Sequence, residues 1–174
     1  DWNRRRLEPV GRLDQKPTPM TKKSAPAISR RGDRSMKFFV DTEFNDFRGA
    51  LISMALVAED GSEWYEALPC DNPRPWVAQN VMPIIGKQPL NDALGLATSL
   101  QKFLAQFDRV HIVADWPEDI AHFCAALIVG PGQCINTPPL TFEIDRNLPD
   151  TSTHSLIPHN ALEDARALAK SMRR

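Results

Sequence analysis

The sequence predicts an α/β fold in which a mixed β-sheet is flanked by α-helices. Three segments rich in β-forming residues come first. Segments with helical and strand periodicity then alternate to the end of the chain. We expect the first three strands to be antiparallel and the later strands to be parallel, in the order βββαβαβα.

The three antiparallel strands follow one another closely. Residues 37–42 form a short apolar run that leads into acidic residues, and residues 51–58 form a second β-rich run. Asp60 and Gly61 are typical of a tight turn, which places a third strand at residues 63–68.

Helices and further strands alternate in the next part of the chain. Apolar residues recur at helical spacing in residues 90–107, which predicts a long amphipathic helix before a strand at residues 109–114. A helix is expected at about residues 117–129. The loop at residues 130–139, rich in Gly and Pro, then leads to a strand at residues 140–144.

A polar loop at residues 147–158 precedes the last predicted helix. Asn160 and Glu163 form a capping box at the start of that helix. Its apolar stripe consists of Ala161, Leu162, Ala165, Leu168, Ala169 and Met172.

Length and composition fit one substantial core. The chain has 174 residues, of which 42% are apolar and 25% charged. The longest apolar run, residues 123–129, is far below the roughly 20 residues of a membrane span, and the first residues lack a secretory signal pattern. Cys70, Cys124 and Cys134 are odd in number and lack metal-ligand spacing. We therefore expect reduced thiols, a cytoplasmic protein and no membrane partner.

Charge divides the chain in two. Residues 1–35 hold ten basic and four acidic residues, whereas residues 36–174 hold eleven basic and eighteen acidic ones. The first segment shows no periodicity and is expected to lack packed structure. It is either a flexible arm drawn to phosphates or an accident of the assumed start site. Met36, just before the first strand, favours the second interpretation, and residues 36–174 are the predicted domain.

Four carboxylates and one histidine point to chemistry: Asp41, Glu43, Asp119, His159 and Asp164. Residues two apart on a strand share a face, so Asp41 and Glu43 can grip the same ion pair. Mg²⁺ and Mn²⁺ prefer carboxylate oxygens, and phosphodiester cleavage benefits from two such ions about 3.5–4 Å apart. The set predicts a nuclease that uses two divalent cations.

Three of these carboxylates also have a structural interpretation. Asp41 and Glu43 could be two solvated acids at a strand end, and Asp119 gains from the helix dipole in a first helical turn. Asp115 stands just before the same helix, with Glu118 three residues later. It is better explained as a helix cap, although it could also orient a ligand or a water.

His159 is the candidate general base. It lies in a loop just before the helix that carries Asp164, and an unperturbed histidine pKa of about 6.5 suits proton transfer near neutrality. His154 is a rival but has no acidic residue at matching spacing after it, and we interpret it as a loop histidine. His111, in a strand, and His122, on a helix face, are interpreted as structural.

These motifs resemble the DEDDh branch of the DnaQ-like 3′-to-5′ exonuclease superfamily, which has a ribonuclease H-like fold. Asp41-Thr42-Glu43 matches the first motif, Asp119 takes the ligand position of the second, and His159 with Asp164 meets the third. The resemblance covers about residues 36–174 and is greatest to the small stand-alone exoribonucleases of bacteria and phages. It suggests RNA rather than DNA and a homodimer. The carboxylate set itself predicts two Mg²⁺ or Mn²⁺ ions, and the excess of seven acidic residues in residues 36–174 favours single-stranded 3′ ends as substrate.

The chain departs from this family pattern in two places. Asp115 replaces the Asn that usually opens the second motif, and Phe44 stands where a Thr often follows the first Glu. Phe44, Asn45 and Trp116 are candidate substrate-binding residues, because aromatic rings can stack on terminal bases. For each of the three, core packing or a bond within a loop is an equal alternative.

Three classes of function follow from the sequence: a hydrolytic exonuclease, a nucleic-acid-binding module that has lost catalysis on the same fold, and a nonenzymatic acidic interaction domain. The filled catalytic positions disfavour the second, and their spacing disfavours the third. A DNA-directed 3′-to-5′ exonuclease stays open beside an RNA-directed one.

Overall fold

The computed structural model describes residues 35–171. These residues belong to one unit of the chain, Arg31–Arg174. The basic N-terminal segment lies outside the described residues except for Ser35, which begins the first strand, and Met172 of the last predicted helix lies outside them too. No helix within residues 35–171 has the length and apolar character that a membrane span requires.

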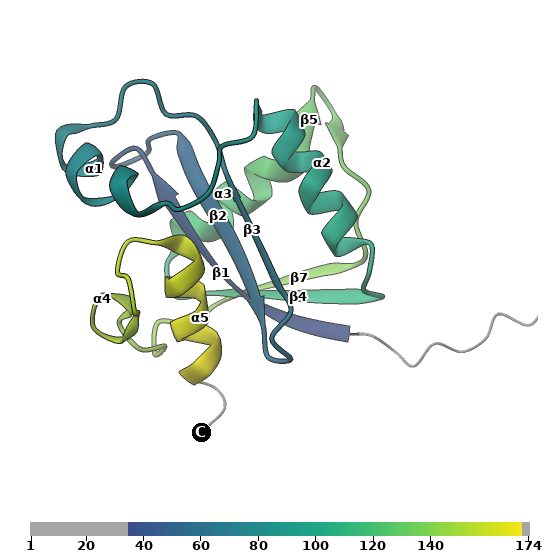
Figure 1. Cartoon of the computed structure of the whole chain (residues 1–174). Helices are drawn as coiled ribbons and strands as arrows, with labels where there is room; N and C mark the ends of the chain where they lie inside the picture. Colours follow the sequence, from purple (N-terminus) through teal and green to yellow (C-terminus); the bar gives the residue numbers. More distant parts are fainter. Residues whose placement is uncertain (1–34, 172–174) are drawn as a thin grey trace, which may run out of the picture. The chain divides into compact units, whose positions relative to one another are not determined.

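A five-stranded mixed sheet forms the centre of this unit, in the order β3-β2-β1-β4-β7 (Figure 1). Strands β1, β2 and β3 pair antiparallel, whereas β4 pairs parallel with both β1 and β7. This confirms the predicted mixed α/β fold. The strands are Ser35–Phe44 (β1), Leu51–Ala58 (β2), Glu63–Ala67 (β3), Arg109–Ala114 (β4) and Leu140–Ile144 (β7).

Helices cover both faces of the sheet (Figure 1). Helices α2 (Ala93–Leu104) and α3 (Pro117–Leu127) pack on one face, and α5 (Ala161–Ser171) packs on the other, against β1 and β2. The connection between β3 and α2 holds two short elements, α1 (Pro75–Asn80) and the 3₁₀ helix η1 (Met82–Ile84).

Alternating residues of β1 reach the two cores. Phe38 and Val40 are fully buried against the face that α2 and α3 cover, where Leu100 is also buried. Phe39 is buried on the opposite face, with Leu168 of α5. Because successive side chains of a strand point to opposite faces, this run is apolar on both sides and fixes β1 in the middle of the sheet.

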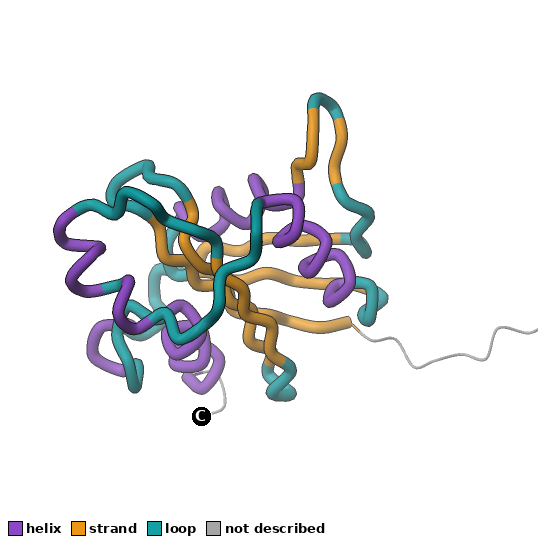
Figure 2. Tube along the Cα trace, turned by 45° about the horizontal axis from the view of Figure 1, so that its top comes forward, coloured by secondary structure: helices purple, strands orange, loops and turns teal. Residues whose placement is uncertain are grey.

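The region after α3 differs from the prediction. The helix ends at Leu127, and β5 (Ile128–Gly130) pairs with β6 (Gln133–Cys134) in a hairpin where helix and loop were expected. Ile128 and Val129 are β-branched, and Gly132 supplies the positive φ of 67° at the turn. Figure 2 shows the hairpin projecting away from the sheet.

The short helices had no sequence signal strong enough to predict them. Helices α1 and α4 (Thr151–His154) span one or two turns, too few for apolar periodicity to appear. Asp150 caps α4 by accepting a hydrogen bond from Ser152 N at 2.9 Å. The capping prediction for α5 is confirmed in part, because Asn160 Oδ1 accepts from Glu163 N at 3.2 Å, while the Glu163 carboxylate binds Arg166 instead.

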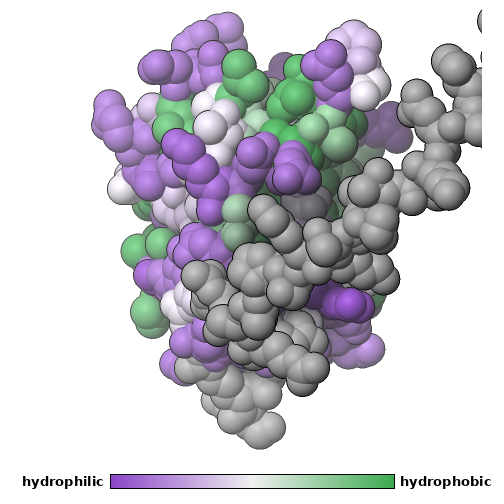
Figure 3. All heavy atoms as spheres, turned by 90° about the vertical axis from the view of Figure 1, so that its right-hand side faces the viewer, coloured by the Kyte–Doolittle hydropathy of each residue, from purple (hydrophilic) through white to green (hydrophobic). Residues whose placement is uncertain are grey.

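The buried face of α2 differs in part from the apolar stripe predicted in residues 90–107, which included Leu94 and Leu100 but not Leu96. Leu94 is 61% exposed, whereas Leu96 is buried. Asp92 caps the helix by accepting from Gly95 N. The buried face consists of Leu96, Ala97, Leu100 and Leu104, and Leu94 lies outside it. Leu94 lines an apolar groove of about 650 Å³ with Ile128 and other residues. Figure 3 shows hydrophobic side chains gathered in the upper part of one face, the part where α2 and the β5–β6 hairpin lie in Figure 1.

Two leucines of α2 provide a matched test of this packing. Leu100→Ala removes a fully buried side chain, so we expect the free energy of unfolding to fall by about 2–5 kcal/mol. Leu94→Ala on the same helix should cost less than about 1 kcal/mol, because most of that side chain is already in water. Denaturant unfolding of both variants measures the difference, and equal losses would contradict the assigned face.

Candidate metal centre

The predicted carboxylates meet where β1 and β4 separate. The pairing of β1 with β4 ends at Phe39 and Val113, so Asp41 and Glu43 extend beyond it. Asp115 directly follows the last residue of β4. The carboxyl ends of these parallel strands therefore open a crevice at one edge of the sheet, which is where α/β folds bind ligands.

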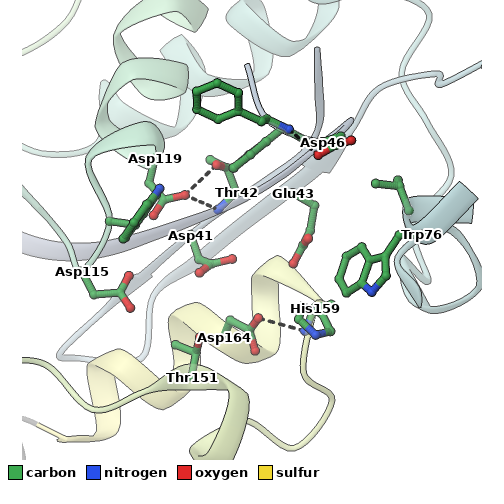
Figure 4. A pocket seen from close by; sticks show the side chains of 14 residues that line it. Asp41, Thr42, Glu43, Asp46, Trp76, Asp115, Asp119, Thr151, His159 and Asp164 are labelled. Atoms are coloured by element: carbon green, nitrogen blue, oxygen red, sulfur yellow. Dashed lines mark hydrogen bonds between the residues drawn. The ribbon is translucent and has the colours of Figure 1, made fainter. Parts of the chain in front are cut away.

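Both faces of β1 contribute to the crevice. Asp41 and Glu43 share the face of Phe39, toward α5, where Asp164 stands in the first helical turn. Thr42 points to the other face and meets Asp119 in the first turn of α3. Figure 4 shows Asp41 in the centre, between Glu43 and Asp164 on one side and Asp115 and Asp119 on the other.

Two groups of carboxylates could each hold a metal ion. One is made of Asp41, Asp115 and Asp119, and the other of Asp41, Glu43 and Asp164. Within each group, one oxygen from every residue lies within 4.8 Å of the others. Asp41 belongs to both groups, so the geometry offers two neighbouring cation positions that share one ligand.

Thr42 fixes the orientation of Asp119. Its hydroxyl donates to Asp119 Oδ1 at 2.6 Å, and its backbone N–H donates to the same oxygen at 3.1 Å. Thr42 is 6% exposed and Asp119 3% exposed. Both bonds occupy one carboxylate oxygen and leave the second free for a cation.

Asp164 is held in a similar way. Its Oδ2 accepts a hydrogen bond from the backbone N–H of His159 at 3.0 Å. Its Oδ1 is buried and forms no hydrogen bond of good geometry within the described residues, although the Ser155 hydroxyl lies close enough to lower the Asp164 pKa. A buried carboxylate oxygen without a partner is costly in free energy unless a ligand satisfies it.

Burial, with the neighbouring negative charges as a smaller cause, raises the pKa of every carboxyl group in the cluster. Burial is the largest cause for Asp41, whose pKa lies well above its ordinary value, and the charges of Asp119 and Glu43 add to it. Burial and the Asp164 charge raise the pKa of Glu43 to about 8. The pKa of Asp119 rises to about 7, again mainly through burial. Burial also raises the pKa of both Asp115 and Asp164.

Asp115 does not cap α3 as predicted. The residue at the cap position is Trp116, and no side chain bonds the first turn there. Glu118 does not complete a capping box either, because its carboxylate accepts a hydrogen bond from Arg48 N at 3.0 Å. Pro117 at the first helical position needs no N–H partner, which removes part of the demand for a cap. Asp115 instead turns its carboxylate toward Asp41.

His159 lies at the edge of the acidic pocket. Its backbone adopts a left-handed conformation, with φ of 67°, immediately before α5. Its ring meets the Trp76 ring edge-on, with 4.9 Å between the ring centres. His154 lies elsewhere: its Nδ1 is 2.8 Å from Thr153 Oγ1, and it is not among the residues that line this pocket.

The other two histidines also lie outside the pocket lining. His111 bonds Thr141 and Glu143 across the neighbouring strand. The His122 ring packs against the Phe44 ring at 4.9 Å. Both positions fit the structural interpretation of these two residues.

The three candidate substrate-binding residues differ in whether they line the pocket. Phe44 and Trp116 line the pocket, and Trp116 is 48% exposed. Asn45 does not line it. Its Oδ1 accepts from Arg74 N and its Nδ2 donates to Asn72 O, so its amide joins two loops as the structural alternative expects.

Sequence reasoning missed several residues that line the pocket, whose volume is about 460 Å³. Thr42 stood between two named carboxylates, and its position in the strand could have marked it as facing α3. Trp76 carried no local sequence signal. Its segment is joined to the site by a long-range contact, in which Asn160 Nδ2 donates to Ile84 O at 2.7 Å. The further lining residues are Asp46, Phe47, Val77 and Thr151.

The clustered carboxyl groups should make the metal-free protein less stable as pH rises. Glu43 and Asp119 have ordinary values of 4.5 and 3.8, and folding raises their pKa to about 8 and about 7. The folded state therefore binds more protons, so this contribution to stability is complete below about pH 4 and is lost as pH rises to about 8. With a chelator present, we expect the unfolding midpoint to fall by at least about 4 °C between pH 5 and pH 8.

Glu43→Gln is the control for this pH dependence. The amide does not titrate, so the fall in the unfolding midpoint should be smaller in this variant. A midpoint that stays constant or rises over the same range in the wild type would contradict the raised pKa values.

Comparison with known proteins found no family model that matches the chain and no matching curated protein. The case for its function therefore rests on the residues and geometry of the site.

Proposed function

We propose that this protein is a two-cation 3′-to-5′ exonuclease of the DEDDh type on a ribonuclease H-like fold, acting on single-stranded RNA ends. The observation that carries the proposal is the position of Asp41 in both carboxylate groups. Phosphodiester cleavage by two cations uses ions about 3.5–4 Å apart, which a shared ligand favours. The strand order and the order of the three motifs support the same proposal.

The residues present fit Mg²⁺ or Mn²⁺. All the donor atoms are carboxylate oxygens, the ligands that these hard cations prefer. None of the ion pairs within residues 35–171 involves the five carboxylates, and Asp164 Oδ1 forms no hydrogen bond of good geometry there. The bound cations would supply positive charge that stabilises the transition state and makes water a stronger nucleophile.

The chain's own groups then have distinct roles. Asp41 holds both cation positions together, Thr42 keeps Asp119 oriented, and the His159 backbone keeps Asp164 oriented. The His159 side chain, at the pocket edge, accepts the proton of the attacking water. Its left-handed backbone lets the same residue donate to Asp164 and present its ring to the pocket.

The surroundings of the site favour a strand end over a long duplex. A pocket of about 460 Å³ has the size of a small-ligand site and suits one terminal nucleotide. Residues 36–174 carry an excess of seven acidic residues, so extended contact with duplex phosphates would be unfavourable. Exposed Trp76 and Trp116 at the rim offer rings on which unpaired bases can stack.

End-labelled substrates test this proposal. Single-stranded RNA and DNA, labelled at the 5′ or 3′ end, are incubated with Mg²⁺ or Mn²⁺ and the products are followed in time. We expect stepwise shortening from the 3′ end, release of nucleoside 5′-monophosphates and slow attack on blunt duplex. Efficient cleavage of a circular single strand would overturn the exonuclease assignment, since a circle has no end.

Asp41→Asn identifies the source of this activity. Losing the shared ligand should lower turnover by at least about a hundredfold while the protein remains folded. Glu143→Gln is the matched control, because Glu143 is an acid of β7 that does not line the pocket. Activity near the wild-type level in Asp41→Asn would remove Asp41 from the mechanism.

His159→Ala tests the general base. We expect turnover to fall by about 10²–10⁴, with Mn²⁺ affinity largely kept, because the imidazole is not a cation ligand in this arrangement. His154→Ala is the control, and a larger loss in His154→Ala than in His159→Ala would reverse the assignment.

A further inference from the structure

We propose that the strand upstream of the scissile phosphate lies in a groove between Phe47 and Trp116, with its bases on these rings and its phosphates beside Arg48 and Arg146. This inference rests on the proposed function and names a binding subsite for that same activity. Its ligand class is a single strand with unpaired bases.

The groove is continuous with the acidic pocket. It has a volume of about 400 Å³, and Phe47 and Trp116 line both it and the acidic pocket. Trp116 directly follows Asp115 in the chain, and both residues line the acidic pocket. The remaining lining residues of the groove are Arg48, Pro117, Glu118 and Ala121.

Both rings are exposed to an unusual degree for their size. Phe47 is 75% exposed and Trp116 48% exposed. Exposed aromatic side chains that lie together beside a polar pocket indicate a ligand surface. Because every nucleobase has an apolar face, base stacking is the chemistry that such rings offer next to a nuclease site.

An arginine side chain lies over each ring in a cation–π contact. The Arg48 guanidinium carbon lies 5.0 Å from the centre of the Phe47 ring, and that of Arg146 lies 4.5 Å from the centre of the Trp116 ring. Arg146 also donates from Nη1 to Asp115 O at 2.5 Å, which anchors it beside the acidic pocket. The acidic pocket repels a phosphate backbone. The positive charges of Arg48 and Arg146 beside it would supply the attraction that the carboxylates do not.

The turn that presents Phe47 is held by specific bonds. Phe47 N donates to Asp46 Oδ1 at 2.7 Å, and Arg48 N donates to Glu118 Oε1 at 3.0 Å. Asp46 and Arg48 both have left-handed backbones, with φ of 65° and 57°. A Cβ at Gly49 would lie 1.9 Å from Asn45 O, so only glycine fits there. The exposed ring is thus kept in place at an energetic cost, as expected of a binding surface.

Two substrates separate this subsite from the catalytic centre. The p-nitrophenyl ester of uridine 5′-monophosphate has a scissile bond but no upstream nucleotides, whereas an RNA of eight nucleotides has both. We expect Phe47→Ala to lower kcat/KM for the RNA by about five- to a hundredfold more than for the ester. Phe47→Leu keeps an apolar side chain without an aromatic face, and should lose nearly as much.

Arg48→Ala and Arg146→Ala test the phosphate contacts. Each should reduce the salt dependence of kcat/KM for the RNA by about one phosphate contact, a slope of about 0.7 in a log–log plot. Arg109→Ala is the control for charge, because Arg109 is exposed at the start of β4, at the far end of the strand from Asp115. Arg109→Ala should leave kcat/KM and its salt dependence unchanged for both substrates.

The rates on the two substrates separate a failure of the groove from a failure of the proposed function. If the wild type cleaves both substrates and Phe47→Ala lowers the two rates equally, the groove is not the upstream subsite and the proposed function stands. If the wild type cleaves neither substrate, the proposed function fails and the groove fails with it. A selective loss on the RNA, together with an unchanged unfolding midpoint, supports the groove.

Discussion

Repulsion among buried carboxylates is the constraint around which this structure is built. Asp41 is 8% exposed, and the four other acids of the cluster surround it (Figure 4). Burial and mutual charge both oppose ionisation, which is why the pKa of each group is raised. Such an arrangement is unfavourable on its own. It becomes favourable when cations occupy it, and the strained surroundings, including the left-handed His159, are consistent with a site selected for binding rather than stability.

The rest of the fold holds the cluster together against that repulsion. Strand β1 is apolar on both faces up to Val40 and is paired with β4 as far as Phe39. Its pairing with β2 continues through Asp41, which holds the backbone of Asp41 on that edge. Thr42 ties this strand to α3 through Asp119, and the turn before α5 ties itself to Asp164. Two helices on opposite faces of the sheet thereby deliver carboxylates to one point. The proposed substrate surfaces, in contrast, come from connections such as the loop that carries Phe47.

The sequence allowed prediction of whatever has a local pattern. Strands β2, β4 and β7 agree with their predicted bounds because apolar runs and turn residues mark them. The acids of the cluster were found because their order along the chain is informative. The role of Thr42 was not predicted, because its hydrogen bond to Asp119 joins residues 77 positions apart in the chain. The sequence favoured a helix cap for Asp115 over a role beside a ligand, and the contact of its carboxylate with Asp41 depends on how β1 and β4 pair.

Cation stoichiometry tests the central claim most directly, because it asks whether Asp41 joins two cation positions. Mn²⁺ binding to the wild type, Asp41→Asn and Asp115→Asn can be followed by calorimetry and by the paramagnetic resonance of free Mn²⁺. Two ions per chain are expected in the wild type, with both weakened in Asp41→Asn and one kept in Asp115→Asn. No saturable binding in the wild type, or binding in Asp41→Asn equal to that of the wild type, would contradict a shared ligand.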